Sequence, residues 1–248
     1  MFPPVMLGLI GLSWATLFLW EASPYGRYLD HGNWTEIGIA ATICTVLPQG
    51  EILLPLLLYS GGWLLMSTAM MLPTTLPLLA VFRRLVMGRS DASSLVALVI
   101  TGYLLAWAGF GVAAHLLDSA LNVLVRENLW LTFNGWLLGA AVLALAGAFQ
   151  FSRLKHQCLT LCRTPFSFVV SHWHGVAPRR ESLWLGLSHG AFCVGCCWAL
   201  MLLMFVVGTG SVGWMLALGA VMALEKNLTS GWMARHLGTM IGIALLGG

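Results

Sequence analysis

The sequence predicts an all-α integral membrane protein, a polytopic bundle of transmembrane helices in one domain. Hydrophobic residues fill 59% of the 248 positions, charged residues fill only 8%, and the mean hydropathy is +0.87. This composition is typical of chains embedded in lipid, and it excludes disordered, collagen-like, coiled-coil and disulfide-scaffold proteins. The small net charge of +3 indicates orientation in a bilayer rather than nucleic-acid binding.

Six apolar stretches are long enough to cross a bilayer, which takes about 20 residues. Two further apolar segments are too short: residues 35–47, which predict an outward-facing interfacial or re-entrant helix, and residues 237–248, which predict a C-terminal half-span. The six predicted spans cover residues 3–20, 56–82, 94–117, 129–150, 183–207 and 212–229.

Basic residues predict the orientation of these spans, because Lys and Arg accumulate in cytoplasmic loops during insertion. Ten of the 12 lie at or after the ends of the second, fourth and sixth spans, and only Arg27 and Arg126 fall in loops on the other side. The sequence therefore predicts six crossings, with both termini and the connection 151–181 in the cytoplasm.

The fifth predicted span, ESLWLGLSHGAFCVGCCWALMLLMF, carries a face of soft metal ligands. Residues three or four apart on a helix are neighbours, so its histidine and its three cysteines share one arc. Methionines of the second span lie at a similar depth. Imidazole, thiolate and thioether donors suit Cu(I) or Zn(II), which predicts a site for copper, with zinc as the alternative ion. The simpler interpretation is that cysteine and methionine only fill space between helices. The candidate ligands are His189, Cys193, Cys196, Cys197, Met70 and Met71.

Glu225 and Lys226 lie near the end of the sixth predicted span. Ionisable residues within a span are costly to bury and are candidates for a functional role. We expect Glu225 to face the interior, where it either orients His189 through a hydrogen bond or pairs with Lys155 or Arg163. A structural alternative is that Glu225 pairs with Lys226, an interfacial arginine or water.

The connection 151–181 contains a second set of soft donors. Cys158 and Cys162 lie one helical turn apart, and His172 and His174 follow after a proline, so the four predict a second, cytoplasmic metal site. The spacing matches no standard zinc finger. The alternative is an inert pair of reduced thiols, because cytosolic reductants keep such thiols free.

Three motifs occur in order: WLLMSTAMMLPTTLPLL, LKHQCLTLCRTP, and CVGCCWALMLLMF followed by WM and ALEKN. Over residues 60–230 the chain resembles the bacterial family of predicted metal-binding integral membrane proteins, domain of unknown function 2182. The resemblance implies a bacterial inner (cytoplasmic) membrane location. Phe149-Gln150 stands where the family pattern leads us to expect Tyr-Gln, which removes a hydroxyl. The family's recurring residues correspond here to Met70, Met71, Pro73, Lys155, Cys158, Cys162, Arg163, Cys193, Cys196, Cys197, Glu225 and Lys226.

Three functions compete at this stage. The favoured one is handling of a soft metal ion within the bilayer. The second is a non-catalytic accessory subunit of a larger membrane complex, a metalloenzyme or a photosynthetic assembly, which the 12 tryptophans and the two short apolar segments favour. Its partners would be the lipid bilayer and other membrane subunits. The third is a thiol oxidoreductase using Cys193 and Cys196, which is disfavoured because a mid-helix pair does not readily close a disulfide.

No catalytic residue is evident, and an enzymatic activity is not expected. Haem is not expected either, because His115 and His189 fall at opposite ends of their predicted spans.

Overall fold

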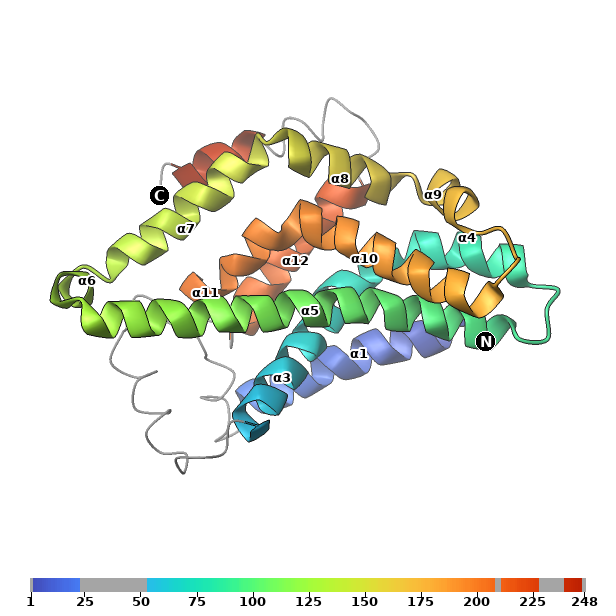
Figure 1. Ribbon diagram of the computed structural model, residues 1–248, viewed down its shortest axis with the longest axis horizontal. Coiled ribbons are helices and arrows are strands. Elements are labelled where there is room, and N and C mark those ends of the chain that lie inside the picture. The colour runs from blue at the N-terminus through green and yellow to red at the C-terminus, as the bar shows by residue number, and fades with distance from the viewer. Residues whose placement is uncertain (1, 23–52, 208–210, 228–238, 247–248) are drawn as a thin grey trace.

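The computed structural model describes residues 2–22, 53–207, 211–227 and 239–246, and the regular structure in these ranges is helical (Figure 1). This confirms the predicted all-α class. The predicted helix at 35–47 lies outside the described residues, whereas 239–246 of the predicted half-span are helical. The helices are α1 Phe2–Glu21, α3 Leu53–Met71, η2 Leu72–Thr75, α4 Leu76–Val86, α5 Ala92–Glu127, α6 Leu129–Phe133, α7 Trp136–Gln150, α8 Arg153–Arg163, α9 Pro165–His172, α10 Pro178–Leu202, α11 Met204–Val207 and α12 Val212–Asn227.

Two predicted spans are interrupted. The span 56–82 contains a 3₁₀ turn, η2, around Pro73, because a proline lacks the N–H that an α-helix needs at that position. The span 129–150 is divided between α6 and α7, and α8 then leaves α7 at 62°. Ser152 begins α8 in an extended conformation, and its hydroxyl accepts the N–H of Lys155 at 3.1 Å, a typical N-cap.

Three helices within the described residues are long and apolar enough to cross a membrane, and the bent pair α7 and α8 makes a fourth if it counts as one span. The six predicted spans are therefore helical over most of their length, but their number as crossings stays a prediction. The three helices are Ser60–Val86, Ala92–Val125 and Pro178–Val206.

The long helices α5 and α10 form the central pair of the fold and run side by side in the same direction (Figure 1). A Cβ atom on Gly186 would lie 2.0 Å from the carbonyl oxygen of Val99, and one on Gly102 would lie 2.2 Å from that of Leu183. Only glycine allows this backbone contact. Gly186 and Gly190 are four residues apart, the spacing at which small residues let two helices approach closely.

Helix α12 completes the centre by packing against α3, η2, α8 and α10. Met215, Met222, Glu225 and Lys226 of α12 are all buried. Because α8 and α12 both contact α10, the side chains that meet between these three helices come from distant parts of the sequence. This meeting point is the candidate site.

Candidate functional site

The donor face of α10 points into the protein interior. His189 is 3% exposed, Cys193 0%, Cys196 1% and Cys197 2%. The contact of α10 with α5 through its glycines and with α8 on the other side accounts for this burial. The soft donors of α10 therefore lie inside the helical bundle and do not face its surroundings.

Cys193 contacts a buried lysine. Nζ of Lys226 donates to the Cys193 sulfur at 2.8 Å, and the hydroxyl of Tyr103 lies 3.1 Å from the same sulfur. Lys226 is 7% exposed and Tyr103 2%. An ammonium group at this distance stabilises a thiolate, the form of cysteine that binds metals.

The break between α3 and α4 supplies the other neighbours of Lys226. Its Nζ donates to the hydroxyl of Thr74 at 3.1 Å and lies 4.0 Å from the sulfur of Met71. The 3₁₀ turn η2 carries Thr74 just after Met71, so the interruption at Pro73 directs both toward the lysine. Met70 is also buried but packs against Gly219 of α12 instead.

The other thiols form a chain of contacts between α8 and α10. The sulfurs of Cys196 and Cys197 are 3.2 Å apart, and Cys162 of α8 hydrogen-bonds Cys196. Cys158 lies against Gly195, where a Cβ atom would come within 2.8 Å of its sulfur. We call Cys158, Cys162, Cys193, Cys196 and Cys197 the thiol cluster.

The thiol cluster joins two sites that the sequence analysis treated as separate. Cys158 and Cys162 lie against α10 and not beside the histidines with which we grouped them. His172 stacks on Phe168 with ring centroids 4.3 Å apart, and His174 is exposed in the loop before α10. Within the described residues, no three His, Cys, Asp or Glu side chains converge as a ready-made metal site, and the sulfur contacts are pairwise, Cys196 with Cys197 and Cys196 with Cys162.

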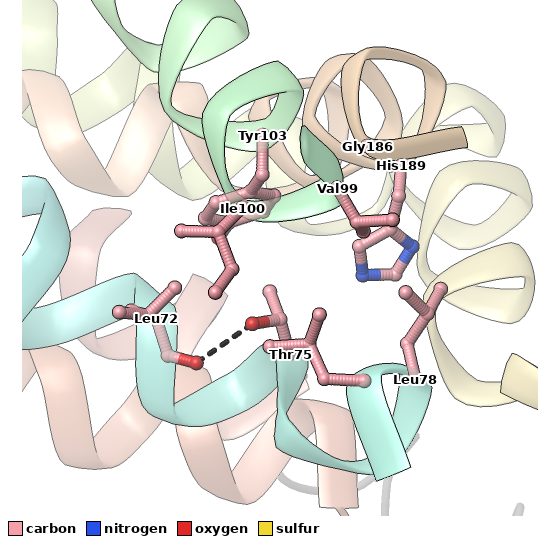
Figure 2. A pocket seen from close by; sticks show the side chains of 9 residues that line it. Leu72, Thr75, Leu78, Val99, Ile100, Tyr103, Gly186 and His189 are labelled. Carbon is pink, nitrogen blue, oxygen red and sulfur yellow. Dashed lines mark hydrogen bonds between the residues drawn. The ribbon is translucent and has the colours of Figure 1, made fainter. Parts of the chain in front are cut away.

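His189 lies one turn before Cys193 and faces a small cavity between α5, α10 and the break at η2. Figure 2 shows its imidazole directed toward Thr75 and Leu78. Its Nδ1 atom is buried and forms no hydrogen bond with any residue that the structure describes. Glu225 does not supply that hydrogen bond, because its carboxylate is used elsewhere.

Glu225 forms a buried ion pair with Lys155. Nζ of Lys155 lies 2.8 Å from both carboxylate oxygens, and the two residues are 3% and 2% exposed. The same Nζ donates to the side-chain oxygen of Gln150, and the guanidinium of Arg163 donates to the backbone carbonyl of Glu225. Of the partners we expected for Glu225, Lys155 is the one whose side chain pairs with its carboxylate. Lys226 points away toward the thiols.

Sequence reasoning overlooked Tyr103 and the role of Gln150. Tyr103 is one of only four tyrosines, and it lies within a predicted span, where a hydroxyl needs a partner. Gln150 ends α7, and Phe149 beside it packs edge-on against Trp198 at 4.9 Å. A polar side chain inside an apolar stretch was the signal available for both.

The described helices bury four thiols, keep a fifth, Cys162, partly exposed, and place a lysine against one of them, Cys193. Thiols are the donors that soft metal ions such as Cu(I) prefer, so these features are typical of a protein that handles a soft metal ion. The family model PpoB2, described as a copper chaperone, matches residues 60–247, well over half of the chain. The chain therefore belongs to this copper chaperone family, which confirms the expectation of a metal-related family and of copper handling in general. No curated protein and no solved structure matches the chain.

Proposed function

We propose that the chain is an integral membrane copper chaperone that receives Cu(I) at the thiol cluster and passes it to a partner protein. The observation that carries this proposal is the contact of Cys193 with Lys226 inside a group of five thiols, four of them buried and the fifth, Cys162, partly exposed. Copper is the cargo here. The cluster must therefore bind the ion tightly enough to keep water away from it. It must also release the ion when the thiols of a partner protein compete for it.

The donor chemistry supports Cu(I) over the alternative ion. Thiolates select Cu(I) and Zn(II) among biological cations. Structural zinc takes four protein ligands in a tetrahedron, and no such convergence occurs among the described residues. Cu(I) is stable with two thiolates, which suits sulfurs arranged in pairs such as Cys196 and Cys197, or Cys162 and Cys196. Few ligands also make the ion easy to transfer.

Charge balance gives Lys226 a role. Cu(I) held by two thiolates carries a net charge of minus one, and burial of an unpaired charge is costly. The ammonium of Lys226, at 2.8 Å from Cys193, supplies the compensating charge without leaving its place. A divalent ion with the same two thiolates would be neutral and would leave the charge of Lys226 uncompensated.

The location belongs to the same proposal. Three or four apolar helices of spanning length, together with basic residues grouped after the second, fourth and sixth predicted spans, support embedding in a bacterial inner membrane with both termini in the cytoplasm. Other membrane proteins are then the natural recipients. A reporter fused after Gly248 that was active only outside the cytoplasm would contradict this orientation.

The test is Cu(I) binding by protein purified in mild detergent. We expect the wild type to bind Cu(I) with higher affinity than Zn(II), and the variant Cys193→Ser with Cys196→Ser to lose the bound copper. The measurement is metal content after competition with a Cu(I) chelator.

Met201→Leu is the matched control, because it removes a buried soft donor of α10 that lies outside the thiol cluster and conserves volume. It should retain copper. Wild-type protein without Cu(I) affinity would overturn the proposed function, and copper retained by the double variant would move the site away from Cys193 and Cys196.

A further inference from the structure

His189 needs a partner that no described residue provides. Its side chain is 3% exposed, its Nδ1 has no hydrogen bond, and it faces the small cavity between η2, α5 and α10 (Figure 2). A buried polar atom left without a partner costs free energy. The remaining lining is mostly apolar, with Leu72, Val99 and Ile100 among its residues. The cavity therefore presents one nitrogen donor to whatever occupies it.

His172 presents a second nitrogen donor, nearer the surface. Its Nδ1 lies 2.9 Å from the carbonyl oxygen of Phe168. The same Nδ1 lies 2.9 Å from the hydroxyl of Ser171. In the tautomer with the hydrogen on Nδ1, Nδ1 donates to the carbonyl and Nε2 keeps its lone pair for a metal ion. Histidine ligands of metals are fixed in this way, with one ring nitrogen bonded to a carbonyl and the other bound to the metal. His172 ends α9 and is partly exposed.

Phe168 separates the two imidazoles. Its ring is stacked on His172 with centroids 4.3 Å apart, and it meets the ring of His189 edge-on at 5.4 Å. The side chain is 3% exposed. The aromatic ring of Phe168 thus fills the space between a histidine at the surface and a histidine in the interior.

The row of side chains formed by His172, Phe168 and His189 continues from His189 to the thiol cluster. Cys193 follows His189 by one helical turn on the same face of α10. Tyr103 bridges the two, because its ring lies 6.1 Å from that of His189 and its hydroxyl contacts the Cys193 sulfur. An ion at His189 is therefore one ligand exchange away from Cys193.

We propose that Cu(I) enters and leaves the thiol cluster through His172 and His189, and that Phe168 closes the passage between them. This inference rests on the proposed function. Each step exchanges one ligand: a bond from copper to an imidazole nitrogen breaks as a bond to the next donor forms, ending on the Cys193 thiolate. The ion remains Cu(I), so no oxidant or reductant takes part. Neutral imidazoles bind Cu(I) less strongly than thiolates do, so an ion held by a histidine moves on readily to the next ligand.

Helix α9 carries both Phe168 and His172 and is held in place at its C-terminal end. It is a short helix, beginning at Pro165 and ending at His172, and Trp173 after it packs edge-on against Phe82 of α4 at 4.9 Å. The carboxylate of Glu181 anchors the following loop by accepting four backbone N–H groups at 2.7–3.1 Å. The anchor leaves the Phe168 side chain as the part that must move for an ion to pass.

The experiment measures the rates at which detergent-purified full-length protein takes up Cu(I) and loses it to a chelator in a stopped-flow instrument. Phe168→Ala should raise both rates by about tenfold, equivalent to a barrier lower by about 1.4 kcal/mol, and leave the equilibrium affinity unchanged. His172→Gln should lower both rates, again at constant affinity. Phe168→Leu is a milder variant that keeps the interior filled if the alanine variant unfolds.

Phe149→Leu is the matched control, because Phe149 makes a similar edge-on contact with α10, at Trp198, away from the histidines. Its rates should equal those of the wild type. Unchanged rates in the folded Phe168 and His172 variants would overturn the passage. Wild-type protein that binds no Cu(I) would instead overturn the proposed function, so the two failures are distinguishable.

Discussion

Glu225 and Lys226 are neighbours in the sequence, and both are buried, but they lie in two different environments. Glu225 faces α8, where Lys155, Gln150 and Arg163 contact its carboxylate or its backbone. Lys226 faces α3, η2 and α10, where its partners are the Met71 sulfur, the Thr74 hydroxyl and the Cys193 sulfur. One region pairs full charges of opposite sign, whereas the other pairs a cation with polarizable sulfur.

The difference indicates what each region does. The pair of Glu225 and Lys155 is complete, because each charge has its counter-charge and further hydrogen bonds, so it holds α8 on α12. Among the described residues, Lys226 contacts one hydroxyl and two sulfur atoms, and one of these sulfurs belongs to a thiol. A thiol can exchange its proton for a metal ion, so this second region is suited to binding.

The largest effect is expected from Glu225→Gln. The substitution leaves the buried ammonium of Lys155 without its counter-charge, which typically costs about 3–5 kcal/mol. We expect that loss in the free energy of unfolding, measured by denaturant titration in detergent.

Replacing both residues by apolar ones, Lys155→Met with Glu225→Met, should restore most of the lost stability, because removing a buried pair together is often neutral. A double variant as unstable as Glu225→Gln would show that the pair has a further role. A single variant with wild-type stability would contradict the comparison itself.

A smaller effect, on binding and not on folding, is expected from Lys226→Met. The apolar chain keeps the volume but removes the charge that balances two copper-bound thiolates. Loss of a group that supports metal ligands typically weakens affinity by about 10- to 100-fold. Chelator competition with Cu(I) measures this change.

Lys226→Arg keeps the charge and should retain most of the Cu(I) affinity. This variant therefore distinguishes the effect of the positive charge from the effect of the shape of the lysine side chain. Equal Cu(I) affinity in Lys226→Met and wild type would remove the role of Lys226 as the compensating charge. Denaturant titration of the same variants verifies that they fold.

The smallest effect is expected at the surface pair of Arg89 and Asp91, 2.8 Å apart. The hydrogen bond from Arg89 lowers the pKa of Asp91 below its ordinary 3.8. A lowered pKa stabilises the fold above the ordinary value, and this contribution disappears as the pH falls through the folded-state pKa. Exposed pairs contribute little. Asp91→Asn should leave the melting temperature nearly unchanged at neutral pH, and a large decrease would contradict the contrast between buried and exposed pairs.

Much of the fold follows from composition and periodicity. The all-α class is confirmed, and the predicted spans agree with helices over most of their length. The breaks were harder to place. Pro73 is visible in the sequence, but a proline can either kink a helix or end it, and packing decides which. The turn between α7 and α8 depends on the Ser152 cap, and serine is common at many positions that are not caps.

The candidate site was predictable only within one helix. Spacing of three and four residues placed His189, Cys193 and Cys196 on one face of α10, and the structure buries that face. Copper handling is confirmed at the level of the family, whereas the ligand set remains a prediction. The same rule of spacing placed Cys158 beside Cys162, but it could not indicate that both face α10 and not His172.

The sequence by itself determined the helical class, the apolar character of the long helices and the soft donors on α10, because these depend on composition and on contacts a few residues apart. Tertiary structure alone decided which side chains meet across helices. Gly186 and Gly102 let α5 and α10 touch, α8 brings Cys162 to Cys196, and α12 directs Glu225 and Lys226 to opposite sides. The physical reason is that burial requires every charge and hydrogen-bonding group to find a partner. Those partners come from segments far apart in the chain, which local pattern does not connect.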